Sequence, residues 1–456
     1  MDKELWDKIT AFDFDSPYSE YGFSIRLAHE NFWTKEFTAL AILEYKKFMY
    51  LAATSEFMVS PSAIVDTVWH QHLIFTQSYQ KFCKLLKKQI QHLPSTHNRE
   101  DFEKFKEAKL KTNTLYSSTF GQQPIAIWEF NDMFESLNLT KANIKIRSFI
   151  IFGIFMFILL TIPAYFLLKP FYIAIENPDF IFGYIFLAIA TFIGLESYNR
   201  IALNKIALTF DKNSFIYNLN PFELIYLKTQ KIANIIHGTV NELIANKTIC
   251  VNTDKSIELS AVKNIVTDEQ VQTVKSLQEV HQTFYPTLSK LLIQKPIFGN
   301  TANCMDAFQK YCIKSKKFGI LFYTNFAVLA LLLMIGIVRV VTGISRDKPV
   351  TQIIIGCAMI TIIAIIYLKR LTKLIGTRTI PALYKNNILT KQQIADDWQW
   401  TYFLFGASVL TTSFAPLASY TDNNFSSGSS CGSSCGGGGS SCGSSCGSSC
   451  GGCGGD

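Results

Sequence analysis

Residues 149–168 read FIIFGIFMFILLTIPAYFLL and carry no charged side chain. An α-helix rises about 1.5 Å per residue, so about 20 apolar residues can cross the hydrocarbon core of a bilayer, which is about 30 Å thick. This stretch therefore predicts a membrane-spanning helix. Pro163 lies inside it, and membrane helices tolerate such a proline.

Three further apolar runs extend this pattern to two hairpins. The chain is 48% hydrophobic and only 17% charged, whereas soluble proteins carry about 25% charged residues. The links inside the two pairs of runs are too short to form domains, so we predict transmembrane hairpins over residues 149–195 and 318–368. Their helices are predicted at 149–168, 180–195, 318–338 and 350–368. A weaker run at 400–417 either crosses the membrane or lies in its interface.

The segments between the apolar runs have soluble character. We predict a multi-domain membrane protein in which an all-α domain precedes the first hairpin and a small α+β, winged-helix-like cytoplasmic module separates the two hairpins. A cytoplasmic segment and a disordered tail rich in Gly, Ser and Cys follow the second hairpin. The predicted boundaries are 1–146 for the helical domain, 196–317 for the module, 369–421 for the segment and 422–456 for the tail.

The central module is predicted from the order of its elements. Short apolar runs at 206–210 and 214–217 resemble strands, and helical patterns follow at 221–228 and 231–246. A hairpin around Asp254 then suggests the winged-helix shape. The helix 231–246 would be the DNA-reading helix, but it is nearly neutral, which argues against nucleic-acid binding. Such modules also serve as contacts for other proteins.

Basic residues predict the orientation in the membrane. Lys and Arg flank the outer ends of both hairpins, whereas the links inside the hairpins carry little net charge. The positive-inside rule then places the N-terminus, the central module and residues 369–399 in the cytoplasm. The first residues lack the basic and apolar regions of a signal peptide. We therefore expect a multi-pass protein of the cell (inner) membrane with a cytoplasmic N-terminus.

The N-terminal domain contains a cluster of metal-ligand residue types within and after a predicted helix over residues 63–88. Asp66 and His70 are four residues apart and share one helix face, whereas His70 and His72 would point about 200° apart on a regular helix. Two His and a carboxylate can bind a divalent transition metal, with His92 or water completing the site. In the alternative interpretation the carboxylate only orients a histidine, and Trp69, Thr76 and Tyr79 are structural. Both interpretations stay open.

The same residues carry a resemblance to a known family. Asp66, Trp69, His70 and His72, with Tyr79 and a later histidine before a proline, resemble the N-terminal motif of the glycine-rich-domain-containing protein family. The remainder, including residues 220–227, is similar to a bacterial family of uncharacterised membrane proteins that ends in a Gly- and Cys-rich tail. The resemblance implies this architecture and brings no established activity.

The tail holds six cysteines in a low-complexity sequence. Their spacing is not a clean zinc pattern, and no ordered scaffold is predicted around them. A soft-metal chelator, disulfide cross-links and an inert tail are the three alternatives. The tail thiols are Cys431, Cys435, Cys442, Cys446, Cys450 and Cys453.

No sequence motif identifies a reaction. Phosphate loops, dinucleotide fingerprints and nucleophile triads are missing from the sequence, and the apolar runs hold almost no ionisable residues of the kind that transporters use. We favour a non-enzymatic scaffold or interaction protein whose partners are the lipid bilayer and cytoplasmic proteins. The alternatives are a membrane-anchored metal-dependent enzyme built on Asp66, His70, His72 and His92, and a membrane-tethered winged-helix regulator.

Overall fold

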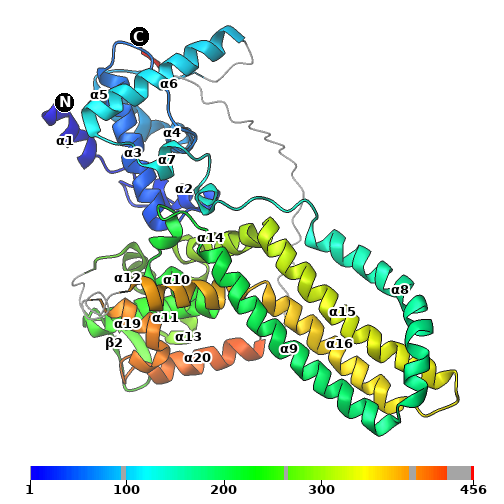
Figure 1. Cartoon of the computed structure of the whole chain (residues 1–456). Coiled ribbons are helices and arrows are strands. Elements are labelled where there is room, and N and C mark those ends of the chain that lie inside the picture. Colours follow the sequence, from blue (N-terminus) through cyan, green and yellow to red (C-terminus); the bar gives the residue numbers. More distant parts are fainter. Residues whose placement is uncertain (1, 94–98, 261–264, 390–396, 429–452, 456) are drawn as a thin grey trace. The chain divides into compact units, whose positions relative to one another are not determined.

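The chain is mostly helical and forms two compact units (Figure 1). The computed structural model describes residues 2–93, 99–260, 265–389, 397–428 and 453–455. Unit 1 comprises residues 1–137, 211–305 and 388–456, and unit 2 comprises residues 138–210 and 306–387.

Unit 2 is built from four long apolar helices. By length and composition each of them could cross a membrane, which confirms the prediction of four long apolar helices. Helix α15 contacts the other three, and Figure 1 shows α9, α15 and α16 running alongside one another. Large apolar side chains such as Phe182 and Phe186 face outward, with exposed fractions of 74% and 75%. The helices are α8 (Ile146–Ala174), α9 (Asn177–Ala207), α15 (Lys316–Ile344) and α16 (Thr351–Leu371).

Close approach and polar contacts hold the four helices together. A Cβ atom on Gly336 would lie 2.5 Å from the hydroxyl of Tyr184 and 2.5 Å from the thiol of Cys357, so α15 packs tightly against α9 and α16. The side-chain amides of Asn199 and Asn325 donate to each other's oxygen at 2.8 and 2.7 Å. Small residues and buried amides of this kind link membrane helices, where the hydrophobic effect does not drive helix association.

Two strand predictions are wrong. Ile206 and Ala207 are the last turn of α9, and Phe215–Tyr217 form the 3₁₀ helix η2 rather than a strand. Short buried apolar runs fit a strand or a helix equally well. In unit 2, the segment after α16 continues as η3 (Ile375–Thr379), α17 (Ile380–Leu383) and η4 (Tyr384–Ile388), of which η3 and η4 are π-helical.

The first part of unit 1 is helical, with one short strand. Its core lies among α3, α4 and α5, where Tyr45, Phe48, Trp69 and Phe82 are fully buried. Strand β1 (Ile90–His92) pairs antiparallel with β5 (Cys453–Gly455). The helices are α1 (Lys3–Ala11), α2 (Phe23–Asn31), α3 (Lys35–Thr54), α4 (Ala63–Ile74), α5 (Thr76–Leu86), α6 (Arg99–Phe120), α7 (Ile125–Trp128) and η1 (Met133–Leu137).

The second part of unit 1 combines helices with a three-stranded antiparallel sheet in the order β2-β3-β4. The predicted hairpin is present, with Cys250 opposite Glu258, and a third strand after α12 joins it. The elements are α10 (Pro221–Thr229), α11 (Ile232–Ala245), β2 (Ile249–Val251), β3 (Ser256–Leu259), α12 (Asp268–Val280), β4 (Gln282–Phe284), α13 (Tyr285–Ile293) and α14 (Pro296–Ile313), which continues beyond unit 1.

The weak apolar run at 400–417 does not form one helix. It is divided into α19 (Trp398–Phe405), η5 (Gly406–Val409) and the start of α20 (Ala415–Gly428). Gly406 has a φ of 65°, in the left-handed region that ends a regular helix. Phe403 and Phe414 are buried within unit 1, so these two side chains of the run pack against protein. Helix α20 also enters the predicted tail, and tail residues 429–452 lie outside the described residues.

Candidate functional site

Helix α4 places two of the predicted ligands on one face. Ser62 caps its start, with the hydroxyl accepting a hydrogen bond from the backbone N–H of Val65 at 3.2 Å. The capped start sets the helical register, so Asp66 and His70 project from the same face one turn apart. The Oδ2 atom of Asp66 lies 3.3 Å from Nδ1 of His70.

Strand β1 brings a third ligand to this face. Nε2 of His92 lies 2.8 Å from Oδ1 of Asp66, and the rings of His70 and His92 are 4.4 Å apart between centroids. One ligand atom from each of Asp66, His70 and His92 therefore lies within 4.8 Å of the others. We call these three residues the Asp–His–His cluster.

The cluster is partly exposed to solvent, and its side chains shift one another's pKa values. The side chain of His70 is 56% exposed, whereas those of Asp66 and His92 are 18% and 11% exposed. Burial opposes ionisation of Asp66, but its hydrogen bonds to the two histidines outweigh this and lower the pKa of its carboxyl group. The hydrogen bond to Asp66 in turn raises the pKa of His70. The carboxylate is thus ionised at neutral pH, as a metal ligand must be.

The structural residues of the motif support the strand that carries His92. The Trp69 ring contacts the His92 ring edge-on, with centroids 4.4 Å apart, and the Trp69 indole donates to the Tyr79 hydroxyl at 3.2 Å. Tyr79 donates onward to the carbonyl of Ile90 in β1. These contacts link α4, α5 and β1 and fix the position of His92. Thr76 is the exposed first residue of α5 and takes no part in these contacts.

His72 is not part of the cluster, although the sequence analysis grouped it there. Helix α4 is regular, so His72 points away from His70 into the core and is fully buried. Its Nδ1 lies 2.9 Å from the Tyr45 hydroxyl, and its ring is surrounded by aromatic side chains that include Phe14 and Phe82. Burial there lowers the pKa of His72 to about 3, which keeps the ring neutral.

The three converging side chains match a two-histidine, one-carboxylate ligand set. Zinc or iron would bind their N and O atoms at about 2.0–2.2 Å, which separates neighbouring ligand atoms by about 3.4 Å. The observed separations from Asp66 are 2.8 Å to His92 and 3.3 Å to His70, through different carboxylate oxygens, and the three ligand atoms lie within 4.8 Å of one another, so the side chains would have to adjust around a bound metal. Without a metal, the same geometry is a carboxylate that orients two imidazoles.

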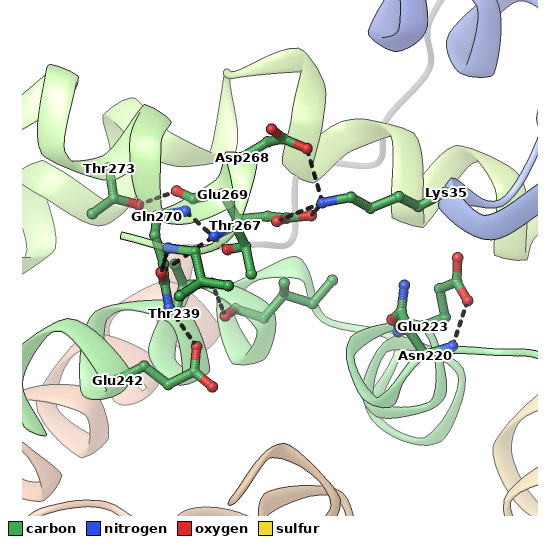
Figure 2. Close-up of polar contacts among 12 residues, drawn as sticks. Lys35, Asn220, Glu223, Thr239, Glu242, Thr267, Asp268, Glu269, Gln270 and Thr273 are labelled. Atoms are coloured by element: carbon green, nitrogen blue, oxygen red, sulfur yellow. Dashed lines mark hydrogen bonds and ion pairs between the residues drawn. The ribbon is translucent and has the colours of Figure 1, made fainter. Parts of the chain in front are cut away.

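A second polar site, which sequence reasoning missed, surrounds a cavity of about 200 Å³ in unit 1. Figure 2 shows Lys35 at the start of α3 reaching Asp268 and Glu269 of α12, at 2.9 and 3.2 Å. Burial opposes the charge on Lys35, but the carboxylates of Glu269 and Asp268 outweigh it and raise its pKa. Glu223 also lines this cavity and is 3% exposed. These residues are far apart in the sequence, so no local motif could have joined them.

The predicted DNA-reading helix is covered on its polar face. In α11, His237 and Asn241 are each 2% exposed. The His237 imidazole contacts the Tyr285 hydroxyl, and the Asn241 side-chain oxygen accepts from the backbone N–H of Thr411 at 2.8 Å. These contacts come from α13 and from the segment before α20, so this face is part of the unit 1 core.

Of the six tail thiols, the structure describes the strand position of one. Cys431, Cys435, Cys442, Cys446 and Cys450 lie outside the described residues, and Cys453 belongs to strand β5.

Comparison with known proteins corrects the family resemblance. A family model described as UCP032817-like matches residues 12–114, less than a quarter of the chain, and this stretch contains the whole Asp–His–His cluster. No glycine-rich-domain family is among the matches, so that resemblance is wrong, and the resemblance to a bacterial membrane-protein family has no support either. Searches of curated proteins and of solved structures returned no match. The matching description names no activity.

Proposed function

We propose that this is an integral membrane protein whose N-terminal helical domain binds a divalent transition metal through Asp66, His70 and His92. The observation that carries the proposal is the convergence of these three side chains from α4 and β1. The metal would stabilise the junction of α4 and β1 and present the exposed His70 side of the site to cytoplasmic partners. The protein would then act as an interaction protein on the membrane.

The membrane part of the proposal rests on the four helices of unit 2. Each has an 18-residue window with mean hydropathy of at least 1.8. Lys145, Arg147, Lys316 and Lys317 flank the starts of α8 and α15, which favours a cytoplasmic location for those ends. Two hairpins return the chain to its starting side. The N-terminal domain and the central module then share the cytoplasmic face of the inner membrane.

Two cavities of unit 1 are lined by residues other than the cluster. An enzyme site is normally a concave pocket in which a substrate can lie beside the reacting groups. Neither the cavity beside Glu223 nor the larger one beside Phe14 is lined by any member of the cluster. We propose a metal-binding role and assign no reaction.

The test is metal loading of the full-length protein in detergent, purified without chelator. The six tail cysteines are replaced by serine, so that thiolates do not compete for the metal. Stoichiometric Zn²⁺ or Co²⁺ is expected in this background, with Co²⁺ absorption typical of N/O ligands. His70→Gln changes an exposed side chain and should weaken affinity at least tenfold. Asp66→Asn should do the same.

The matched control is His281→Gln, which removes another exposed histidine of unit 1. This control should load metal like the parent protein. The proposal fails if the parent binds no stoichiometric metal, or if His70→Gln and His281→Gln bind it equally well.

A further inference from the structure

The end of the helix bundle in unit 2 contains a cavity of about 230 Å³ that the metal proposal does not use. Its walls are the last turns of α9 and the π-helical segments η3 and η4 after α16. Arg200, Asn204, Arg378, Asn386 and Asn387 supply its polar lining. Short π-helical segments often occur at functional sites.

The cavity has a surplus of positive charge and free hydrogen-bond donors. Glu196 is its acidic residue, and one oxygen of this carboxylate accepts from Arg378 at 2.7 Å and from the nearby Arg370 at 3.0 Å. Arg200 has no ion pair within the described part of the chain, and the side-chain amides of Asn204 and Asn386 have no hydrogen bond there either. The lining thus holds two guanidinium groups, Arg200 and Arg378, against the single carboxylate of Glu196. An anion is the ligand that this lining complements.

The position of the cavity along the helices indicates which kind of anion it would bind. The apolar run of α9 ends at Leu195, so Glu196 directly follows it and Arg200 lies about one turn further on. Helix α16 reaches the same end, with Lys369 and Arg370 in its last turn. In a bilayer this level is the headgroup layer, where basic pockets between helices bind anionic lipid headgroups.

The wall formed by η3 is held by close packing. A Cβ atom on Gly376 would lie 2.9 Å from Cδ of Gln309, so the side chain of Gln309 fills the space that a larger residue would need. Gln309 is 6% exposed. This contact positions the segment that carries Arg378, and Glu196 fixes the direction of its guanidinium group. The Arg378 guanidinium group is therefore oriented before a ligand arrives, which favours specific binding.

We propose that this cavity binds the phosphate group of an anionic phospholipid of the cytoplasmic leaflet. Arg200 and Arg378 donate to the phosphate oxygens, because planar guanidinium groups match phosphate geometry. The acyl chains lie along the exposed apolar side of α9, where Ile193 is 64% exposed. This inference rests on the membrane part of the proposed function and is independent of the metal.

The test uses the full chain reconstituted in nanodiscs of pure phosphatidylcholine, into which phosphatidylglycerol is titrated. Retention of each lipid after transfer to detergent is measured by native mass spectrometry. The parent protein should retain phosphatidylglycerol in preference to phosphatidylcholine. In the double variant Arg200→Gln, Arg378→Gln, the preference for phosphatidylglycerol over phosphatidylcholine should fall at least tenfold.

The matched control is Lys205→Gln, which removes an exposed positive charge of α9 that does not line the cavity. It should keep the lipid preference of the parent. Equal retention of the two lipids by the parent, or an equal loss in the control and the double variant, overturns the proposal. If millimolar inorganic phosphate displaces phosphatidylglycerol completely, the cavity is a site for free anions. That result would also overturn the proposal. Reconstitution into phosphatidylcholine nanodiscs tests the membrane proposal separately.

Discussion

Glu223 is a carboxyl group in an environment that disfavours its charge. It is 3% exposed, and burial raises its pKa to about 8. Its Oε2 atom accepts from the backbone N–H of Asn220 at 2.8 Å, and the Asn220 side chain accepts from the Glu223 N–H in return (Figure 2). This capping box starts α10. A protonated carboxyl group, or an amide, fills the same role.

Replacing Glu223 with Gln should therefore stabilise the protein at pH 7–8. The folded-state pKa is raised above the usual 4.5. Between these two values the unfolded chain is ionised while the folded chain holds the proton. In the parent, the free energy of unfolding should thus fall as the pH rises from about 5 to 8, by roughly 1.4 kcal/mol per pH unit at most. Glu223→Gln should lack this component. Thermal unfolding midpoints at four pH values measure the difference.

A natural control for this change exists in the same unit. Helix α12 starts with an equivalent capping box in which Gln270 occupies the position of Glu223, so an amide is compatible with the motif. Parallel pH profiles for the parent and Glu223→Gln would show that the buried carboxyl group is not the source of the pH dependence.

At the scale of elements, α15 organises unit 2 because it touches all three of the other long helices. The contact at Gly336 leaves no room for a side chain beyond hydrogen, whereas a Cβ atom on Gly356 of α16 would meet nothing within 4 Å. The two glycines lie in helices of similar composition. They differ in the distance to the neighbouring helix, and that distance decides what each position tolerates.

Gly336→Val should loosen the packing of the four helices, and Gly356→Val should not. The larger side chain at Gly336 would clash with Tyr184 and Cys357, and overpacking of this kind typically costs about 1–3 kcal/mol. A lower thermal midpoint in detergent is expected for Gly336→Val, together with faster proteolysis. Equal midpoints for the two variants would contradict the close approach of α15.

At the scale of the whole molecule, the proposed topology assigns opposite sides of the membrane to different loops. An even number of crossings places both ends of unit 2 in the cytoplasm, and the links inside the two hairpins lie outside. Lys348 is an exposed residue of the second link, and Lys109 is an exposed residue of α6. These positions provide a matched pair for labelling.

In intact cells, an impermeant thiol reagent should label Lys348→Cys and leave Lys109→Cys unlabelled until lysis. Both variants are made with the tail cysteines replaced by serine, so that tail thiols give no signal. The protein should also stay in the membrane pellet after alkaline carbonate extraction. Labelling of both positions to the same extent before lysis would contradict the topology. Release by carbonate would contradict membrane insertion itself.

The sequence alone was enough for the features that depend on length, composition and neighbours within one helical turn. Four apolar runs predicted four long helices, because hydropathy over about 20 residues is a property of the segment itself. The pairing of Asp66 with His70 followed from their spacing, whereas His72, which was grouped with them, lies in the core.

Tertiary structure alone decided which distant surfaces meet. His92 joins Asp66 because Tyr79 anchors strand β1 beside α4, a contact that no local pattern encodes. Glu223 is buried because the tertiary structure of unit 1 encloses it. The apolar runs around Ile206 and at 400–417 could fit a strand, a span or a core helix. The hydrophobic effect is non-directional, so the surface that covers such a run determines its structure.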